Sequence, residues 1–151
     1  MKTFRDNENR EWLVSVNVAT VKRCRDLAGV DLMGAVGGDT IQRLIGDPVL
    51  LCDAIYAVCK PEADARGITD EEFGRGLGGD SIEAATTALL EDLVDFFPMA
   101  KRNLLRKALT KMYEMTTLSI RMAGQKIDAL NPEEIAERYA ASGELSIGSS
   151  E

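Results

Sequence analysis

The hydrophobic pattern changes period near Thr20, and this change constrains the fold more than any other feature. Before it, Trp12, Val14 and Val16 occupy alternate positions, the period of two that is typical of a half-buried strand. After it, apolar residues recur every three or four positions through most of the chain, as on one face of an α-helix. The sequence therefore predicts a β-hairpin within residues 1–18, with its second strand over 11–18, followed by helices.

Start signals divide the helical part of the chain. Thr20 is the expected N-cap of the first helix, because its hydroxyl can accept a backbone hydrogen bond. Asp47 before Pro48 marks the start of another helix, which is expected to run to about Lys60, since proline fits the first helical turn. Residues 61–67 are expected to form a loop.

Two capping boxes predict helices further along the chain. Thr69 with Glu72, and Asp80 with Glu83, have the three-residue spacing of this motif, in which two side chains cap each other's backbone amides. The second box is expected to open a helix that ends at Phe97, before a proline that breaks the helical pattern.

The longest periodic segment covers residues 99–127. Its apolar seam alternates steps of three and four residues, which suits pairing with another helix, and consists of Leu105, Ala108, Met112, Met115, Ser119 and Met122. A last helix is expected over 133–141. The predicted fold is therefore mainly α (α+β): an N-terminal two-stranded β-hairpin packed on a bundle of about six helices, with one long C-terminal helix.

The length of 151 residues suits one domain. We expect a single domain over 1–141, built from the hairpin (1–18), a helical body (20–98) and the long and final helices (99–141). A Gly/Ser-rich tail over 142–151 is expected to be flexible. The sequence has no apolar run long enough for a membrane span and no hydrophobic leader at its start, so the expected location is the cytoplasm.

The absence of histidine removes several classes of catalytic site. Ser–His–Asp and Cys–His mechanisms and His-ligated metals are excluded. The three cysteines are too few for an all-cysteine zinc site, and the G-x-G-x-x-G run at 74–79 lacks the preceding strand of a dinucleotide site. We therefore expect no enzyme, no cofactor and no metal, although a hydrolase that uses only carboxylates stays open.

Charge is unevenly spread along the chain. Residues 98–126 carry seven basic residues and one acidic residue, a net charge of +6, which leaves −13 for the rest of the chain. An acidic body with one basic helix disfavours binding of nucleic acid and suggests a partner of complementary charge. A DNA-binding regulator that uses the basic helix at 99–126 stays open as an alternative.

The order of elements resembles that of the tail assembly chaperones of long-tailed bacteriophages and prophages. The resemblance covers about residues 1–98. The segments that carry it are Phe4 with Trp12-Leu13-Val14-Ser15-Val16, Val21-Lys22-Arg23-Cys24-Arg25-Asp26-Leu27, Val30-Asp31-Leu32, Leu44-Ile45-Gly46-Asp47-Pro48-Val49-Leu50-Leu51-Cys52-Asp53-Ala54-Ile55-Tyr56, Gly67-Ile68-Thr69-Asp70-Glu71-Glu72-Phe73, and Leu89-Leu90-Glu91-Asp92-Leu93-Val94-Asp95-Phe96-Phe97-Pro98.

The resemblance implies a non-enzymatic protein that coats the tape measure protein in the host cytoplasm until tail tube subunits replace it. It also implies a homo-oligomer, and it supplies no catalytic residue. A helical structural or adaptor protein of the virion, in the neck or tail, is the alternative. The long basic helix is a departure from shorter members of the family.

A coating protein needs apolar surface that accepts amphipathic helices. We expect these contacts on the hairpin, at the end of the helical body and on the methionine-rich seam, since methionine adapts to different partners. The candidate residues, each of which could equally belong to the core, are Trp12, Val14, Val16, Phe96, Phe97, Leu105, Met112 and Met115.

Overall fold

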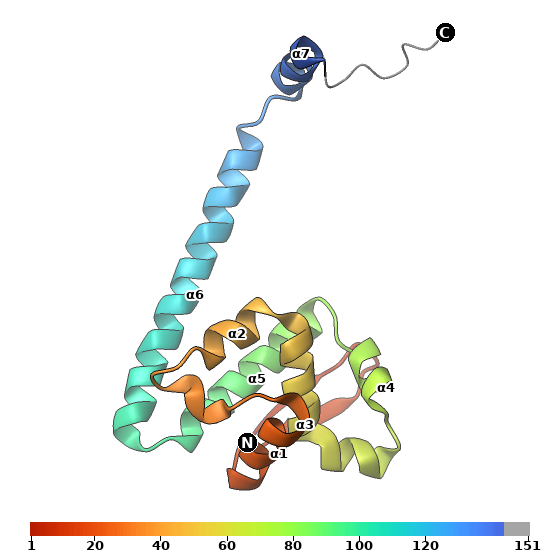
Figure 1. Cartoon of the computed structure of the whole chain (residues 1–151), viewed down its shortest axis with the longest axis vertical. Coiled ribbons are helices and arrows are strands. Elements are labelled where there is room, and N and C mark those ends of the chain that lie inside the picture. The colour runs from red at the N-terminus through yellow and green to blue at the C-terminus, as the bar shows by residue number, and fades with distance from the viewer. Residues whose placement is uncertain (144–151) are drawn as a thin grey trace. The chain divides into compact units, whose positions relative to one another are not determined.

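The computed structural model describes residues 1–143, in two units (Figure 1). The first unit is Met1–Lys107, and the second begins at Ala108. The described residues form seven α-helices and one two-stranded antiparallel sheet, which confirms the mainly α fold with an N-terminal hairpin. The single domain over 1–141 stays a prediction, and the tail expected from residue 142 lies, after residue 143, outside the described residues.

The hairpin is shorter than predicted. Strands β1 (Lys2–Arg5) and β2 (Glu11–Val14) pair with Phe4 opposite Trp12. The expectation that β2 continues to Val18 is wrong, because Asn17 caps the next helix and so ends the extended segment. Its side chain accepts a 3.0 Å hydrogen bond from the amide of Thr20, and it therefore takes the capping role expected of Thr20.

Four helical segments follow the hairpin: α1 (Val18–Ala28), the short 3₁₀ helix η1 (Leu32–Ala35), α2 (Thr40–Gly46) and α3 (Pro48–Arg66). Asp47 caps α3 as predicted, by accepting hydrogen bonds from the amides of Val49 and Leu50. α3 lies at the centre of the first unit, in contact with α1, α2 and β2.

The loop expected over 61–67 is wrong, because α3 continues through Pro61 to Arg66. Proline has no amide hydrogen, so the carbonyl of Ala57 loses its helical donor. Arg23 on α1 replaces that donor: its Nη1 donates to the carbonyl oxygens of Ala57 at 3.0 Å and Val58 at 3.1 Å. A contact with another helix therefore keeps α3 intact at the proline.

Helices α4 (Asp70–Arg75) and α5 (Asp80–Phe96) complete the fold on which the hairpin rests. The capping box of Thr69 and Glu72 is present at the start of α4. The predicted box of Asp80 and Glu83 is wrong, since Gly79 occupies the N-cap position with a φ of 56° and Asp80 is already helical. α5 packs beneath β1, and its Leu89, Leu90 and Leu93 are fully buried.

The second unit has a different character. Helix α6 (Met99–Asp128) starts in the first unit and continues into the second, and α7 (Pro132–Ser142) follows an N-cap at Asn131, close to the helix predicted over 133–141. Among residues 108–143, Leu109 is the one buried residue. The second unit therefore has almost no core of its own.

Candidate protein-binding surface

The hairpin residues expected to contact partners mostly belong to the core. Trp12 and Val14 have no exposed surface, and the ring of Trp12 lies 4.9 Å from that of Phe73 on α4. Val16 is half-buried, and its amide donates to a carboxylate oxygen of Asp92 at 2.6 Å. The structure thus uses these side chains to hold the hairpin on the helices.

A buried carboxylate fixes the turn of the hairpin. Asp6, whose side chain is 1% exposed, accepts hydrogen bonds from the indole of Trp12 at 2.9 Å and from Nε of Arg10 at 2.7 Å. Burial alone would raise the pKa of Asp6, but these hydrogen bonds and the charge of Arg10 lower it below its usual value. Asp6 therefore remains ionised and structural at neutral pH.

The candidates near the junction of α5 and α6 divide between core and surface. Phe97 and Leu105 are buried, whereas Phe96 is half-buried, with its ring 5.6 Å from that of Phe97. Arg102 donates to the carbonyl of Phe97 at 3.2 Å. Of these three candidates, Phe97 and Leu105 therefore belong to the core, although Met99 and Leu104 nearby are 72% and 60% exposed.

Met112 and Met115 lie on the exposed part of α6. Met112 is half-buried and Met115 is 66% exposed. They form one row with Ser119 and Met122, which we call the methionine row (Met112, Met115, Ser119 and Met122). Of the eight predicted contact residues, these two methionines are therefore the ones that the structure places together on an open helix face.

A second apolar row was missed by the sequence prediction. Seven-residue steps place Tyr113, Ile120 and Ile127 on one line along α6, and all three are exposed, Ile120 at 68%. We call them the tyrosine–isoleucine row (Tyr113, Ile120 and Ile127). Their regular spacing is visible in the sequence, so the signal that could have identified this row was present.

The two rows together form an unusually wide apolar face. At about 100° per residue, their centres lie about 120° apart, and the mainly apolar arc from Leu118 to Tyr113 covers about 220° of the helix. An amphipathic helix that rests on one core typically needs an apolar stripe of about 100°. This face of α6 is therefore wide enough to contact more than one neighbouring helix.

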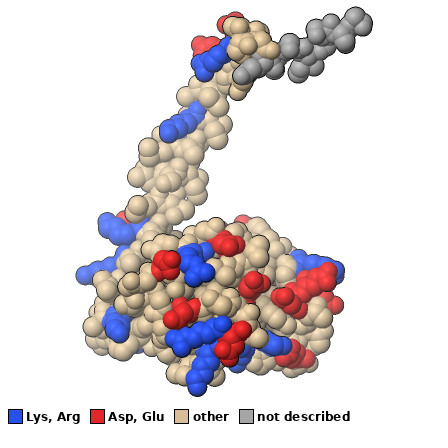
Figure 2. Space-filling model, viewed as in Figure 1, with Lys and Arg blue, Asp and Glu red and all other residues tan. Residues whose placement is uncertain are grey.

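The basic residues of α6 are spread around the helix: beyond residue 107, Lys111 and Lys126 fall within this arc and Arg121 falls outside it. Two of them contact α5 near the start of α6, where Arg106 forms an ion pair with Asp95 at 2.6 Å and Arg102 donates a hydrogen bond to the carbonyl oxygen of Asp95 at 3.3 Å. Figure 2 shows the visible side of α6 beyond residue 107 as mainly uncharged. The exposed part of α6 is thus better described as apolar than as basic.

The cysteines are not activated for chemistry. Burial raises the pKa of Cys24 to about 11 and that of Cys59 to about 12, and burial with nearby carboxylates raises that of Cys52 to about 11. These thiols therefore stay protonated at neutral pH. Within residues 1–143, no group of three or more metal-ligating side chains is placed to hold an ion.

The glycine-rich segment 74–79 links α4 to α5 and contacts the turn of the hairpin. The carbonyl oxygen of Gly76 accepts a 2.7 Å hydrogen bond from the amide of Asn7. In the described part of the chain, every helix is too short or too polar to cross a bilayer.

No family model, curated protein or solved structure matches this chain.

Proposed function

We propose that this chain is a tail assembly chaperone of a long-tailed bacteriophage, which coats the helices of the tape measure protein in the host cytoplasm until tail tube subunits replace it. The observation that carries the proposal is the uncovered apolar face of α6. Residues 108–143 bury one side chain, while large apolar side chains of both rows lie open to solvent.

The second unit favours a helical client for a physical reason. Isolated helices are marginal in water, and most helical stability in proteins comes from packing of the apolar face. A long amphipathic helix laid along α6 would bury the methionine row and be stabilised in return. Flexible methionines adapt to many partner side chains, which suits a client whose sequence changes along its length.

The width of the face also suits several copies on one client. A client helix on the methionine row would not cover Ile120 and Ile127 of the tyrosine–isoleucine row, because the two rows lie about 120° apart. A neighbouring copy of this chain can cover that second row. Many modest contacts along one client then give strong overall binding, while each single copy remains replaceable by tail tube subunits.

The decisive experiment is co-expression with the very long helical protein of the same tail gene cluster. The native chain should raise the soluble yield of this client several-fold and should co-purify with it. Met115→Glu combined with Ile120→Glu places a charge in each row and should abolish both effects. Both positions are exposed, so the fold itself should be unaffected.

Thr117→Glu combined with Gln125→Glu is the matched control, since it adds the same two negative charges to the polar side of the same helix. This control should retain the effect on the client. An unchanged client yield with the native chain would contradict the proposal, as would full activity of the Met115 and Ile120 variant. A chaperone should also be missing from purified virions, whereas a neck or tail component would be present.

A further inference from the structure

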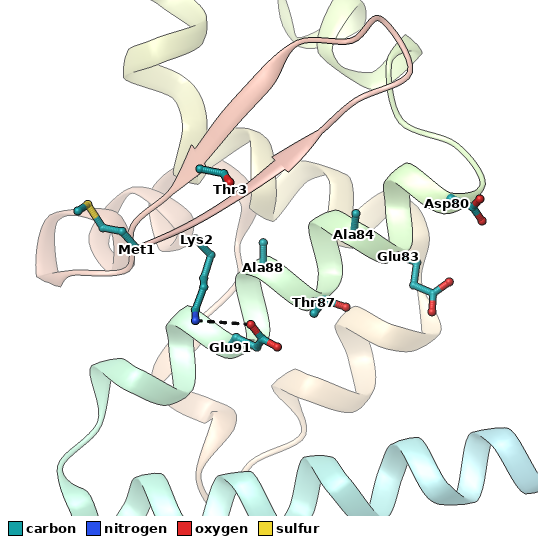
Figure 3. Close-up of a pocket in the computed structure, with 9 residues that line it drawn as sticks. All are labelled: Met1, Lys2, Thr3, Asp80, Glu83, Ala84, Thr87, Ala88 and Glu91. Carbon is teal, nitrogen blue, oxygen red and sulfur yellow. Dashed lines mark ion pairs between the residues drawn. The ribbon is translucent and has the colours of Figure 1, made fainter.

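An open groove of about 680 Å³ lies beside β1 in the first unit. Its wall is Met1–Thr3, its floor is one stripe of α5, and no residue of β2 lines it (Figure 3). Figure 3 shows the stripe running along α5 from Asp80 to Glu91 beneath the start of β1. The groove therefore follows the edge of the sheet that β2 does not cover.

The backbone of β1 offers hydrogen bonds along this edge. In an antiparallel pair, only alternate residues exchange hydrogen bonds with the facing strand. The amide of Asp6 donates to the carbonyl of Arg10 at 3.0 Å, and the register then places the next hydrogen-bonded pair at Phe4 and Trp12. The amide and carbonyl groups of Thr3 and Arg5 therefore point toward the outer edge, where a further strand could pair with them.

The floor of the groove leaves room for such a strand. Its central residues are small: Ala84 is exposed, Thr87 is half-buried and Ala88 is buried. From Asp80 to Glu91 the stripe extends about 16 Å along the helix, the length of about five residues of a β-strand. A strand of five residues can therefore lie beside β1 and above these small side chains.

The rim of the groove defines the charge of its occupant. Asp80 and Glu83 are exposed, and within the described part of the chain neither takes part in an ion pair. At the other end, Glu91 pairs with Lys2 at 3.7 Å (Figure 3). The groove thus presents acceptors for a cation at one end and an exposed, weak ion pair at the other.

We propose that this groove binds a basic, extended segment of another protein, which adds a third strand to the sheet along β1. The segment places a small side chain over the centre of the stripe, between Ala84 and Ala88, and basic side chains at its two ends, one against Asp80 and Glu83 and the other beside Glu91. Backbone hydrogen bonds to Thr3 and Arg5 supply affinity, and the acidic rim supplies specificity. This site is separate from α6 and does not depend on the proposed chaperone function.

The test uses the full chain and a blocked five-residue peptide, acetyl-Arg-Thr-Ala-Thr-Arg-amide. Its alternate positions place arginine, alanine and arginine over α5 in either strand direction. In a nuclear magnetic resonance titration, the peptide should shift the amides of Thr3 and Arg5 and slow their hydrogen exchange. The acidic peptide acetyl-Glu-Thr-Ala-Thr-Glu-amide should bind at least tenfold more weakly, and added salt should reduce this difference.

Two changes in the groove test separately the charge of its acidic rim and the room above α5. Asp80→Asn combined with Glu83→Gln should weaken binding of the basic peptide at least fivefold. Glu134→Gln combined with Glu137→Gln, which removes the same charge from α7, should leave binding unchanged. Ala84→Phe, at an exposed helix position, should fill the groove and abolish binding while Trp12 fluorescence stays native.

Three results would overturn the proposal. The first is the absence of any shift at Thr3 and Arg5 at millimolar peptide. The second is equal binding of the two peptides, or equal effects of the groove and α7 variants. The third is a dimer in light scattering without peptide that Ala84→Phe abolishes, because the edge would then belong to a second copy of the chain.

Discussion

Leu89 on α5 and Ile120 on α6 are aliphatic residues on apolar stripes of similar helices, yet their surroundings are opposite. Leu89 is fully buried, whereas Ile120 is 68% exposed. The hairpin and α3 both lie against α5, and residues 108–143 contain a single buried side chain. The comparison teaches that the same helical pattern can form part of a core in one unit and remain exposed to solvent in the other unit.

The largest expected effect tests this difference directly. Leu89→Ala should lower the free energy of unfolding by about 2–5 kcal/mol, because it leaves a cavity in a packed core. Ile120→Ala should change it by less than about 0.5 kcal/mol, since the side chain is exposed. Urea unfolding followed by circular dichroism measures both. A large loss for Ile120→Ala would mean that another copy already covers this row in solution.

The next effect concerns the contact that keeps α3 intact at Pro61. Arg23→Ala should lower the free energy of unfolding by about 1–3 kcal/mol, because the carbonyl of Ala57 loses its donor. Arg25→Ala on the same helix is the control: it removes an exposed ion pair with Asp31 and should cost less than about 1 kcal/mol. Equal losses for the two variants, measured by urea unfolding, would contradict this role of Arg23.

The smallest expected effect is the dependence on pH of the free energy of unfolding of the first unit. Because the pKa of Asp6 is lowered from 3.8 in the folded chain, its carboxylate stabilises the fold above the unfolded pKa, and this contribution is lost as pH falls through the lowered value. The stability difference between the native chain and Asp6→Asn should be constant from about pH 7 to 5 and shrink below about pH 4.

Fluorescence of Trp12, the one tryptophan of the chain, follows this unfolding because its indole contacts Asp6. Asp64→Asn, which alters an exposed ion pair with Lys60, should give a smaller difference throughout. A difference between the native chain and Asp6→Asn that stays constant down to pH 3 would contradict the lowered pKa.

Several features that depend on neighbouring residues were predictable from the sequence, although the caps expected at Thr20 and Asp80 were wrong. Asp47 before Pro48 and the box of Thr69 with Glu72 both start helices where expected. Each signal acts within one helical turn, so it needs no knowledge of the rest of the fold. The change of period near Thr20 likewise identified the hairpin and the helices.

Features that depend on distant residues were not predictable. Where α3 passes through Pro61, the carbonyl of Ala57 accepts a hydrogen bond from Arg23, which lies 34 residues away in the sequence. The burial of Trp12 depends on Phe73 and Asp6, whereas an alternating pattern says only that one face is covered. The periodic pattern of α6 correctly predicted a helix, but periodicity alone does not distinguish an apolar face that is buried in the core from one that stays exposed.

The role of Arg23 extends beyond the helix that it bridges. The part of α3 after Pro61 carries Glu62, which accepts from the amide of Leu13, and Arg66, which donates to the carbonyl of Glu11 and lies over the ring of Trp12. One guanidinium on α1 thus secures the helical segment on which β2 rests. Contacts therefore connect α1 to α3 and α3 to the hairpin on both sides of Pro61, so we expect loss of the Arg23 contact to loosen the hairpin as well.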